Sequence, residues 1–145
     1  MNNINENLNQ IIEDFNNTLL DLAQNVALIA PYSIIGNNIN TIETIMQKLN
    51  GEQKCKFIDM FIVKVFLDYK QEIYDGDENF FMKMNEDNFK DETEDKESYI
   101  NKLFEFQTLW KDISRENKDV IKQYLVILCQ LAEEYVPLKY PEMVK

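Results

Sequence analysis

Apolar side chains recur at alternating spacings of four and three residues along most of the chain, the pattern of helices that bury one face. The first run predicts a helix from about residue 5 to residue 29, which Pro31 ends. Gly36 and the two asparagines after it predict a turn, and a second helix is expected over 39–49, where an Asn-Gly pair stops it. The apolar positions of the first run are Leu8, Ile12, Phe15, Leu19, Leu22, Val26 and Ile29.

The segment from residue 52 to residue 75 carries apolar side chains on two sides. A helix of this kind usually packs against neighbours on both flanks, so we expect it to form the centre of the fold. The main stripe contains Ile58, Phe61, Ile62, Val65, Tyr69 and Ile73, and the second stripe contains Met60, Val63 and Leu67.

Two further helices are predicted in the C-terminal third of the chain. The first covers about residues 99–113, and Ser114 is a plausible N-cap for the second, whose apolar face runs from Ile121 to Tyr135. Pro137 and a second proline close the chain, so residues 136–145 are expected to form a short irregular tail. The pattern therefore predicts an all-α, single-domain bundle over residues 1–145, with five or six helices around the central helix at about 52–75.

The composition argues against several functional classes. Histidine is absent from the 145 residues, and this removes the commonest catalytic base and metal ligand. The net charge of −11 argues against nucleic acid or an anionic membrane as a direct partner, because phosphate contacts need clustered basic residues. The most apolar stretch is interrupted by charges and is shorter than the roughly 20 residues of a membrane span. We therefore expect a cytoplasmic protein.

The inventory of catalytic groups is poor, and we expect no enzyme activity and no cofactor. Cys55 and Cys129 lie in apolar helical contexts without metal-ligand spacing, which predicts buried, reduced thiols. Asp59 and Asp68 each have a lysine within helical reach, as in ordinary surface pairs. The three glycines form no phosphate-binding loop.

Residues 75–97 are the one region of distinct composition. They contain ten acids and three lysines, a net charge of −7, so most of the charge excess of the molecule lies in this connection. Such charge density disfavours compact structure. The acids are Asp75, Asp77, Glu78, Glu86, Asp87, Asp91, Glu92, Glu94, Asp95 and Glu97.

The same region is the best candidate for recognition of a partner. Aromatic and methionine side chains set among acids can present an apolar contact to a basic, grooved protein. The alternative is that these apolar residues cover one end of the core. The candidate partner-binding residues are Asp77, Glu78, Phe80, Phe81, Met82 and Phe89.

A calcium loop is a further candidate in this region, because acids and amides follow the ligand order of an EF-hand. The loop departs from that pattern at its sixth position, where glycine is replaced by Phe80, and at its ninth, where a ligand is replaced by Lys83. The candidate ligands are Asp75, Asp77, Asn79 and Glu86.

The preferred interpretation is a non-enzymatic protein-protein interaction or scaffold protein. The first alternative is an acidic inhibitor or nucleic-acid mimic that binds a basic host or viral protein. A weak calcium-binding protein is the second alternative. Self-association is also open, since stripes with 4-3 spacing suit oligomeric coiled coils as well as single-chain bundles.

Three short motifs lie in the second half of the chain. Residues 69–82 read YKQEIYDGDENFFM, Phe106 and Trp110 are four residues apart, and residues 116–125 combine Glu-Asn-Lys with spaced apolar positions. These motifs resemble small helical proteins of unknown function from giant nucleocytoplasmic DNA viruses. The resemblance implies a viral protein in the host cytoplasm, associated with the viral factory or the particle, and it assigns no active-site residue.

Overall fold

The computed structural model describes residues 2–77 and 113–143, and every regular element in these two ranges is a helix. The all-α class is confirmed. In chain order the elements are α1 (Asn2–Ile29), α2 (Ile34–Asn37), α3 (Ile39–Gln47), the 3-10 helix η1 (Gly51–Cys55), α4 (Lys56–Phe61), the π-helix η2 (Ile62–Phe66), α5 (Leu67–Asp75), α9 (Arg115–Lys139) and the 3-10 helix η4 (Pro141–Met143).

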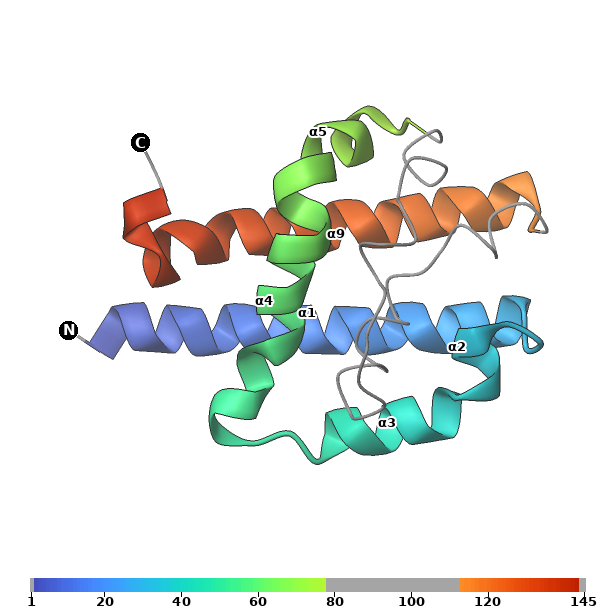
Figure 1. Ribbon diagram of the computed structural model, residues 1–145, viewed down its shortest axis with the longest axis horizontal. Coiled ribbons are helices and arrows are strands. Elements are labelled where there is room, and N and C mark those ends of the chain that lie inside the picture. Colours follow the sequence, from blue (N-terminus) through green and yellow to red (C-terminus); the bar gives the residue numbers. More distant parts are fainter. Residues whose placement is uncertain (1, 78–112, 144–145) are drawn as a thin grey trace.

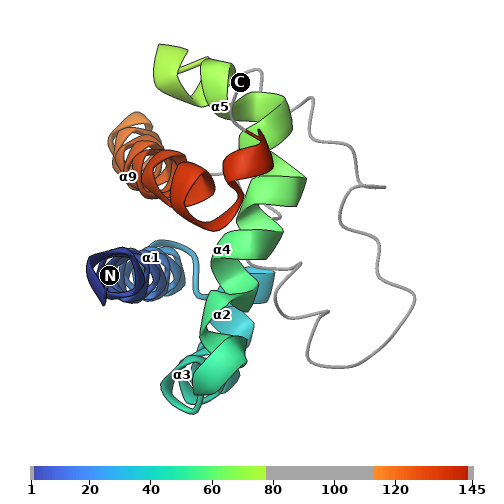
Figure 2. The same ribbon diagram turned by 90° about the vertical axis from the view of Figure 1, so that its left-hand side faces the viewer.

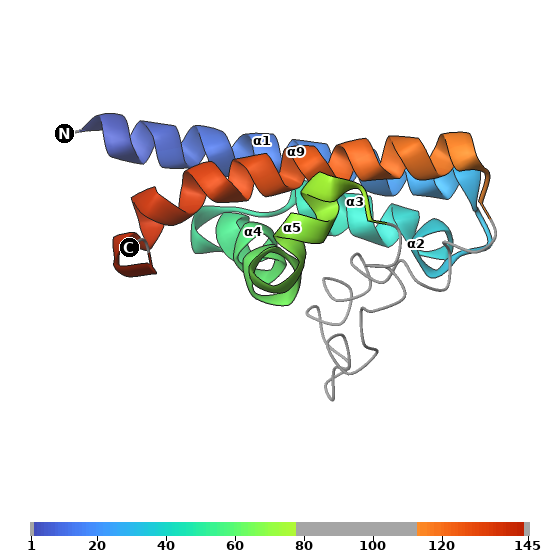
Figure 3. The same ribbon diagram turned by 90° about the horizontal axis from the view of Figure 1, so that it is seen from above.

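The two long helices, α1 and α9, lie side by side and run in opposite directions (Figure 1). The continuous run from α4 to α5 crosses both of them on one side of the molecule (Figure 2). Figure 3 shows α1 and α9 as one layer and the shorter helices as the other. The apolar stripes of α1 and α9 thus face each other and the crossing run, which explains why the 4-3 spacing is strict in these helices.

The core lies where the three runs meet. Phe15 of α1 and Phe61 of α4 pack edge to face, with ring centroids 5.4 Å apart. Ile121 of α9 and Phe57 of α4 are also buried, and they belong to the same continuous cluster of buried side chains. Burial of a large apolar side chain contributes about 1.5–3 kcal/mol, so this cluster as a whole is the main source of stability.

We call the run α4–η2–α5, residues 56–75, the crossing helix. A π-helical turn at Ile62–Phe66 interrupts its α-helical geometry without breaking it. Its main apolar stripe is buried as predicted, with only Tyr69 partly exposed. Of the second stripe, Met60 is partly buried and packs against the core, whereas Val63 and Leu67 are 63% and 53% exposed. The expectation that both sides of this helix are packed is therefore not confirmed.

The connection between α1 and α3 differs from the predicted turn. Gly36 lies inside the short helix α2, whose first turn is capped by the Ser33 hydroxyl, since Gly36 N–H donates to Ser33 Oγ over 3.0 Å. A Cβ on Gly36 would lie 2.5 Å from the carbonyl oxygen of Ala30 and 2.6 Å from that of Pro31. Glycine is needed here because the backbone of α2 packs directly onto the end of α1.

Helix α9 begins as predicted and ends later than predicted. The Ser114 hydroxyl accepts a 3.2 Å hydrogen bond from the Asn117 N–H, which confirms the N-cap. The prediction of an irregular tail from residue 136 is wrong for its first residues, because α9 continues through Pro137 to Lys139. Proline removes only one hydrogen bond near a helix end, and burial of Tyr135 and Val136 holds this last turn in place.

The predicted helix over 99–113 falls almost entirely outside the described residues; of it, Ile113 is described and is buried. No helix in the ranges 2–77 and 113–143 combines the length and apolarity that crossing a membrane requires.

Candidate functional site

The predicted partner-binding and calcium-binding residues fall mostly outside the described ranges. Asp75 and Asp77 are described, whereas the remaining candidates are not: Glu78, Asn79, Phe80, Phe81, Met82, Glu86 and Phe89. Within residues 2–77 and 113–143, no group of three or more cysteine or acidic side chains is arranged to hold a metal ion. The calcium loop therefore stays a prediction.

Asp75 and Asp77 flank the C-terminal cap of α5. Gly76 adopts the left-handed conformation, with φ of 71°, and Asp77 N–H donates to the carbonyl oxygen of Glu72 over 2.9 Å. This is a Schellman cap, which glycine favours because it pays no Cβ penalty. The Asp75 carboxylate accepts a 3.0 Å hydrogen bond from the Gln71 side chain. The acidic connection thus starts from a firmly terminated helix.

A polar cluster joins α4 to the end of α9. Oδ1 of Asp59 accepts hydrogen bonds from the hydroxyls of Tyr135, over 3.0 Å, and Tyr140, over 3.1 Å. Nζ of Lys139 donates to the Tyr135 hydroxyl over 3.1 Å and lies 3.7 Å from Sγ of Cys55. Asp59 is therefore held by two tyrosines, which differs from the surface pair expected from the sequence.

The tyrosines of this cluster stay neutral at ordinary pH. Burial, followed by the nearby negative charge of Asp59 and its hydrogen bond, raises the pKa of Tyr140 to about 12. The same causes raise the pKa of Tyr135 further, because that side chain is fully buried. A phenol that keeps its proton is a hydrogen-bond donor and a poor base, so the cluster fastens the end of α9 to α4.

A second polar contact joins α5 to α9. Glu133 forms the ion pair that links the two helices, with Nζ of Lys70 at 3.4 Å, and it accepts a 3.4 Å hydrogen bond from Tyr74. Burial raises the pKa of the neighbouring Cys129 thiol to about 12, and the Glu133 charge adds to that effect. Cys129 is buried and free, as predicted, whereas Cys55 is free and only half-buried.

The exposed apolar side chains are not spread evenly. Val63 and Leu67 are four residues apart on the crossing helix, so they lie one above the other on the same face. The remaining large exposed apolar residues of the described ranges lie on α1, the α1–α2 connection and α9: Ile4, Leu28, Tyr32 and Ile127. The pair on the crossing helix is adjacent to the acidic connection, which begins eight residues after Leu67 at Asp75.

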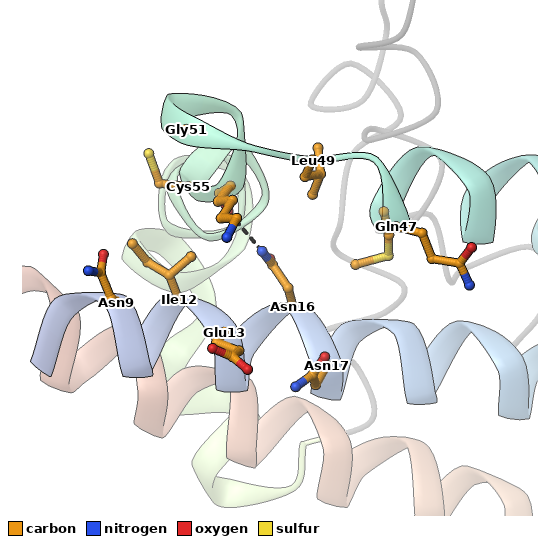
Figure 4. Close-up of a pocket in the computed structure, with 11 residues that line it drawn as sticks. Asn9, Ile12, Glu13, Asn16, Asn17, Gln47, Leu49, Gly51 and Cys55 are labelled. Carbon is orange, nitrogen blue, oxygen red and sulfur yellow. Dashed lines mark hydrogen bonds between the residues drawn. The ribbon is translucent and has the colours of Figure 1, made fainter. Parts of the chain in front are cut away.

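A cavity of about 570 Å³ lies between α1 and the segment that joins α3 to α4 (Figure 4). Asn16 rises from α1, and its Nδ2 donates a 2.9 Å hydrogen bond to the carbonyl oxygen of Lys54. Its Oδ1 is buried and accepts no hydrogen bond from the described residues. The other lining residues are Asn9, Ile12, Glu13, Asn17, Met46, Gln47, Leu49, Gly51 and Cys55.

The charged side chains in the first third of the chain are all acidic. The first basic residue in the sequence is Lys48. Four exposed carboxylates of α1 recur at helical spacing along one side of that helix: Glu6, Glu13, Asp14 and Asp21. The sequence analysis considered acidity only in residues 75–97 and missed this row. The absence of any lysine or arginine before Lys48 is the sequence signal that indicates it.

Comparison with known proteins identified no matching family model, no similar curated protein and no similar solved structure. The assignment of function therefore depends on the geometry of this chain.

Proposed function

We propose that this chain is a non-enzymatic protein that binds another protein through the outer face of its crossing helix. The observation that carries the proposal is the exposure of Val63 and Leu67 on one face of the helix whose opposite face forms the core. We call these two side chains the apolar pair. An apolar contact beside a polar rim is typical of protein-binding surfaces.

The apolar pair marks the middle of a larger interface. Full burial of one such side chain contributes about 1.5–3 kcal/mol, which is too little for stable association by itself. A specific interface usually buries about 800 Å² on each partner. The contact must therefore extend to neighbouring residues of the crossing helix and toward the acidic connection.

The partner should be basic around an apolar patch. Residues 75–97 carry a net charge of −7 and leave the crossing helix at its C-terminal cap. Charge complementarity at an interface speeds association and sets specificity more than it adds affinity. A partner with lysines and arginines around an apolar groove fits both features.

Polar contacts between helices hold the crossing helix in place, and this supports its role as a binding surface. Tyr135 donates a hydrogen bond to Asp59, and Glu133 pairs with Lys70. These contacts join helices that are distant in sequence, and the raised pKa of each affected tyrosine keeps its proton in place. They hold the crossing helix, which presents the apolar pair, against α9.

The viral source and the cytoplasmic location are part of this proposal and depend on the sequence motifs. A small acidic helical protein suits a scaffold role in a viral factory or particle. Contact with a basic viral protein is the form of the proposal that this source favours.

An acidic inhibitor is a second candidate, favoured by the carboxylate row on α1. Glu6, Glu13 and Asp21 recur every seven or eight residues on a long helix, about 10–12 Å apart at 1.5 Å per residue. Such a row can occupy a basic groove that otherwise holds nucleic acid. It predicts salt-sensitive competition with DNA for a basic target.

The test replaces one member of the apolar pair and a matched exposed leucine. Leu67→Asp should abolish capture of the specific partner from the native cells, and Leu28→Asp should leave capture unchanged. Leu28 is the better exposed of the two, at 83%, and lies on α1 away from the pair. Equal capture by both variants, with unchanged thermal unfolding, would contradict the proposed surface.

A further inference from the structure

The side of α1 and α9 that points away from the crossing helix carries two rows of side chains. Each row follows 4-3 spacing, so its members share one side of their helix. The row on α9 is apolar and contains Val120, Tyr124, Ile127 and Leu131. The row on α1 is polar and contains Asp14, Thr18, Asp21 and Asn25. We call these the α9 row and the α1 row.

A hydrogen bond fixes the two rows beside each other. Nδ2 of Asn25 donates to the Tyr124 hydroxyl over 2.7 Å and so joins α1 to α9. Because the two helices run in opposite directions, Asp21 and Ile127 come to the same level about one turn away from this bond. The apolar row therefore has the polar row directly along its side.

The α9 row is only partly covered by the rest of the fold. Ile127 is 43% exposed, and its neighbours Tyr124 and Leu131 are partly buried against the core. Figures 2 and 3 show no other described element over this side of α1 and α9. Two helices that lie side by side leave a shallow channel along their outer surface, and a third helix can pack there.

The charge around Ile127 is negative on both helices. No lysine or arginine occurs in α1, and none occurs in α9 from residue 123 to residue 138. Asp14 and Asp21 are exposed in the α1 row, and Glu134 is exposed one turn after the last member of the α9 row. A second copy of this chain would bring the same carboxylates against these, and like charges in contact cost affinity. The charge therefore favours a cationic occupant.

We propose that this side of α1 and α9 is a second docking surface, and that its occupant is an amphipathic helix of a partner protein, rich in lysine or arginine. The apolar stripe of that helix packs on Ile127 and Leu131, and its basic side chains meet the carboxylates of Asp14 and Asp21. Amphipathic helices bind other proteins through apolar anchors at helical spacing. The surface lies on the other side of the molecule from the apolar pair, so the chain can hold two partners at once and bridge them (Figure 2). This inference goes beyond the proposed function and does not depend on it.

A designed peptide tests the surface. The peptide has about 18 residues, with leucine at 4-3 spacing, lysine beside the leucines, and alanine or glutamine elsewhere. Titrated into the 15N-labelled full chain, it should shift the backbone amides of residues 14–25 and 120–134 and bind with a Kd on the order of 10 μM. The same peptide with glutamate in place of lysine, or with its leucines scattered around the helix, should bind at least about tenfold more weakly. Equal binding of either control peptide, or shifts confined to other residues, would overturn the proposal.

Matched variants locate the contact. Ile127→Asp should raise the Kd of the lysine peptide at least about tenfold. Leu28→Asp changes an exposed leucine outside the two rows and should leave the Kd unchanged. Asp21→Asn should raise the Kd about threefold, whereas Glu13→Gln, which removes a carboxylate on the cavity side of α1, should not. If Glu13→Gln weakens binding as much as Asp21→Asn, net charge explains the binding and the proposal is refuted.

Two further measurements separate this surface from the alternatives. Leu67→Asp should bind the lysine peptide as tightly as the unchanged chain. Loss of binding in this variant, with Ile127→Asp unaffected, would assign the peptide to the apolar pair and refute a second surface. Light scattering should show no dimer that Ile127→Asp dissociates, because such a dimer would mean that a second copy covers the surface. If thermal unfolding shows that Ile127→Asp is destabilised, Ile127→Gln and the map of shifted amides in the unchanged chain decide.

Discussion

The hydroxyl of Tyr135 on α9 donates a 3.0 Å hydrogen bond to Oδ1 of Asp59 on α4, across 76 residues of sequence. Tyr135 is fully buried, and its ring lies under the ammonium of Lys139, 5.6 Å from the ring centroid. The bond fixes the last turns of α9 to the start of the crossing helix. The position of the apolar pair is therefore set partly by a polar contact one turn before Val63 on the same helix.

Loss of the Tyr135 hydroxyl should destabilise the fold. Tyr135→Phe removes one of the two donors to Asp59 and keeps the ring, so the free energy of unfolding should fall by about 1–3 kcal/mol. Urea denaturation followed by circular dichroism measures the change. Tyr32→Phe is the control, because Tyr32 is 61% exposed, and it should alter stability by less than about 0.5 kcal/mol. Equal effects of the two substitutions would contradict the assigned contact.

The raised tyrosine pKa values predict a loss of stability in alkaline solution. A phenol whose pKa is higher in the folded than in the unfolded state stabilises the fold fully below the unfolded value of 10.0. That contribution is lost as the pH rises from about 10 to about 12, the folded value of Tyr74 and Tyr140. The free energy of unfolding, measured at intervals between pH 8 and pH 11.5, should be flat up to about pH 9 and then fall, because the raised pKa of the Cys129 thiol adds to the loss above its unfolded value of 9.0.

The Tyr135→Phe variant sharpens the pH experiment. Since the pKa of Tyr135 is raised most among these tyrosines, the variant should lose less stability over the alkaline range than the unchanged protein. A parallel decline in both proteins would show that Tyr135 does not contribute to the pH dependence.

Close packing of α2 on the end of α1 predicts a large effect at Gly36. Gly36→Ala places a methyl group 2.5 Å from the backbone oxygen of Ala30. Backbone cannot move aside as a flexible side chain can, so the free energy of unfolding should fall by about 2–3 kcal/mol. Gly76→Ala meets open space and only the strain of a positive φ, so it should cost about 1 kcal/mol. Thermal unfolding of the two variants tests this order, and the reverse order would refute the close approach.

The two thiols should differ in reactivity. Cys129 is buried, with a pKa of about 12, so it should react with a thiol reagent only after unfolding. Cys55 is half-buried and should react in the folded protein. Time courses with 5,5′-dithiobis(2-nitrobenzoate) in buffer and in denaturant measure both steps. Cys55→Ser should remove the fast step, and a persisting fast step would place Cys129 at the surface.

The helices could be predicted from the sequence because their apolar spacing is local information. Leu19 and Leu22 of α1 are buried and Ser114 caps α9 where the pattern places them. The continuation of α9 through Pro137 could not be predicted, since it depends on burial of Tyr135 and Val136 against other helices. Without such burial, a proline in this position would mark the end of the helix, and the sequence alone does not distinguish the two cases.

The polar sites were harder to predict because their partners are distant in sequence. Asp59 has a lysine within helical reach, and nothing near it indicates two tyrosine hydroxyls from the opposite end of the chain. Likewise, an asparagine on α1 gives no sign that its amide bonds to the Lys54 backbone and leaves a buried acceptor. The exposure of Val63 and Leu67 became visible only when the buried face of the crossing helix was known.

Site-specific photocrosslinking tests the central claim, that the apolar pair contacts a protein partner, most directly. A benzophenone amino acid is placed at position 63, 67 or 28 of the chain in cells that express it naturally. The account predicts the same crosslinked protein from positions 63 and 67, through a peptide rich in lysine or arginine beside apolar residues, and none from position 28. Equal crosslinking from all three positions, or crosslinking from position 28 alone, would contradict it.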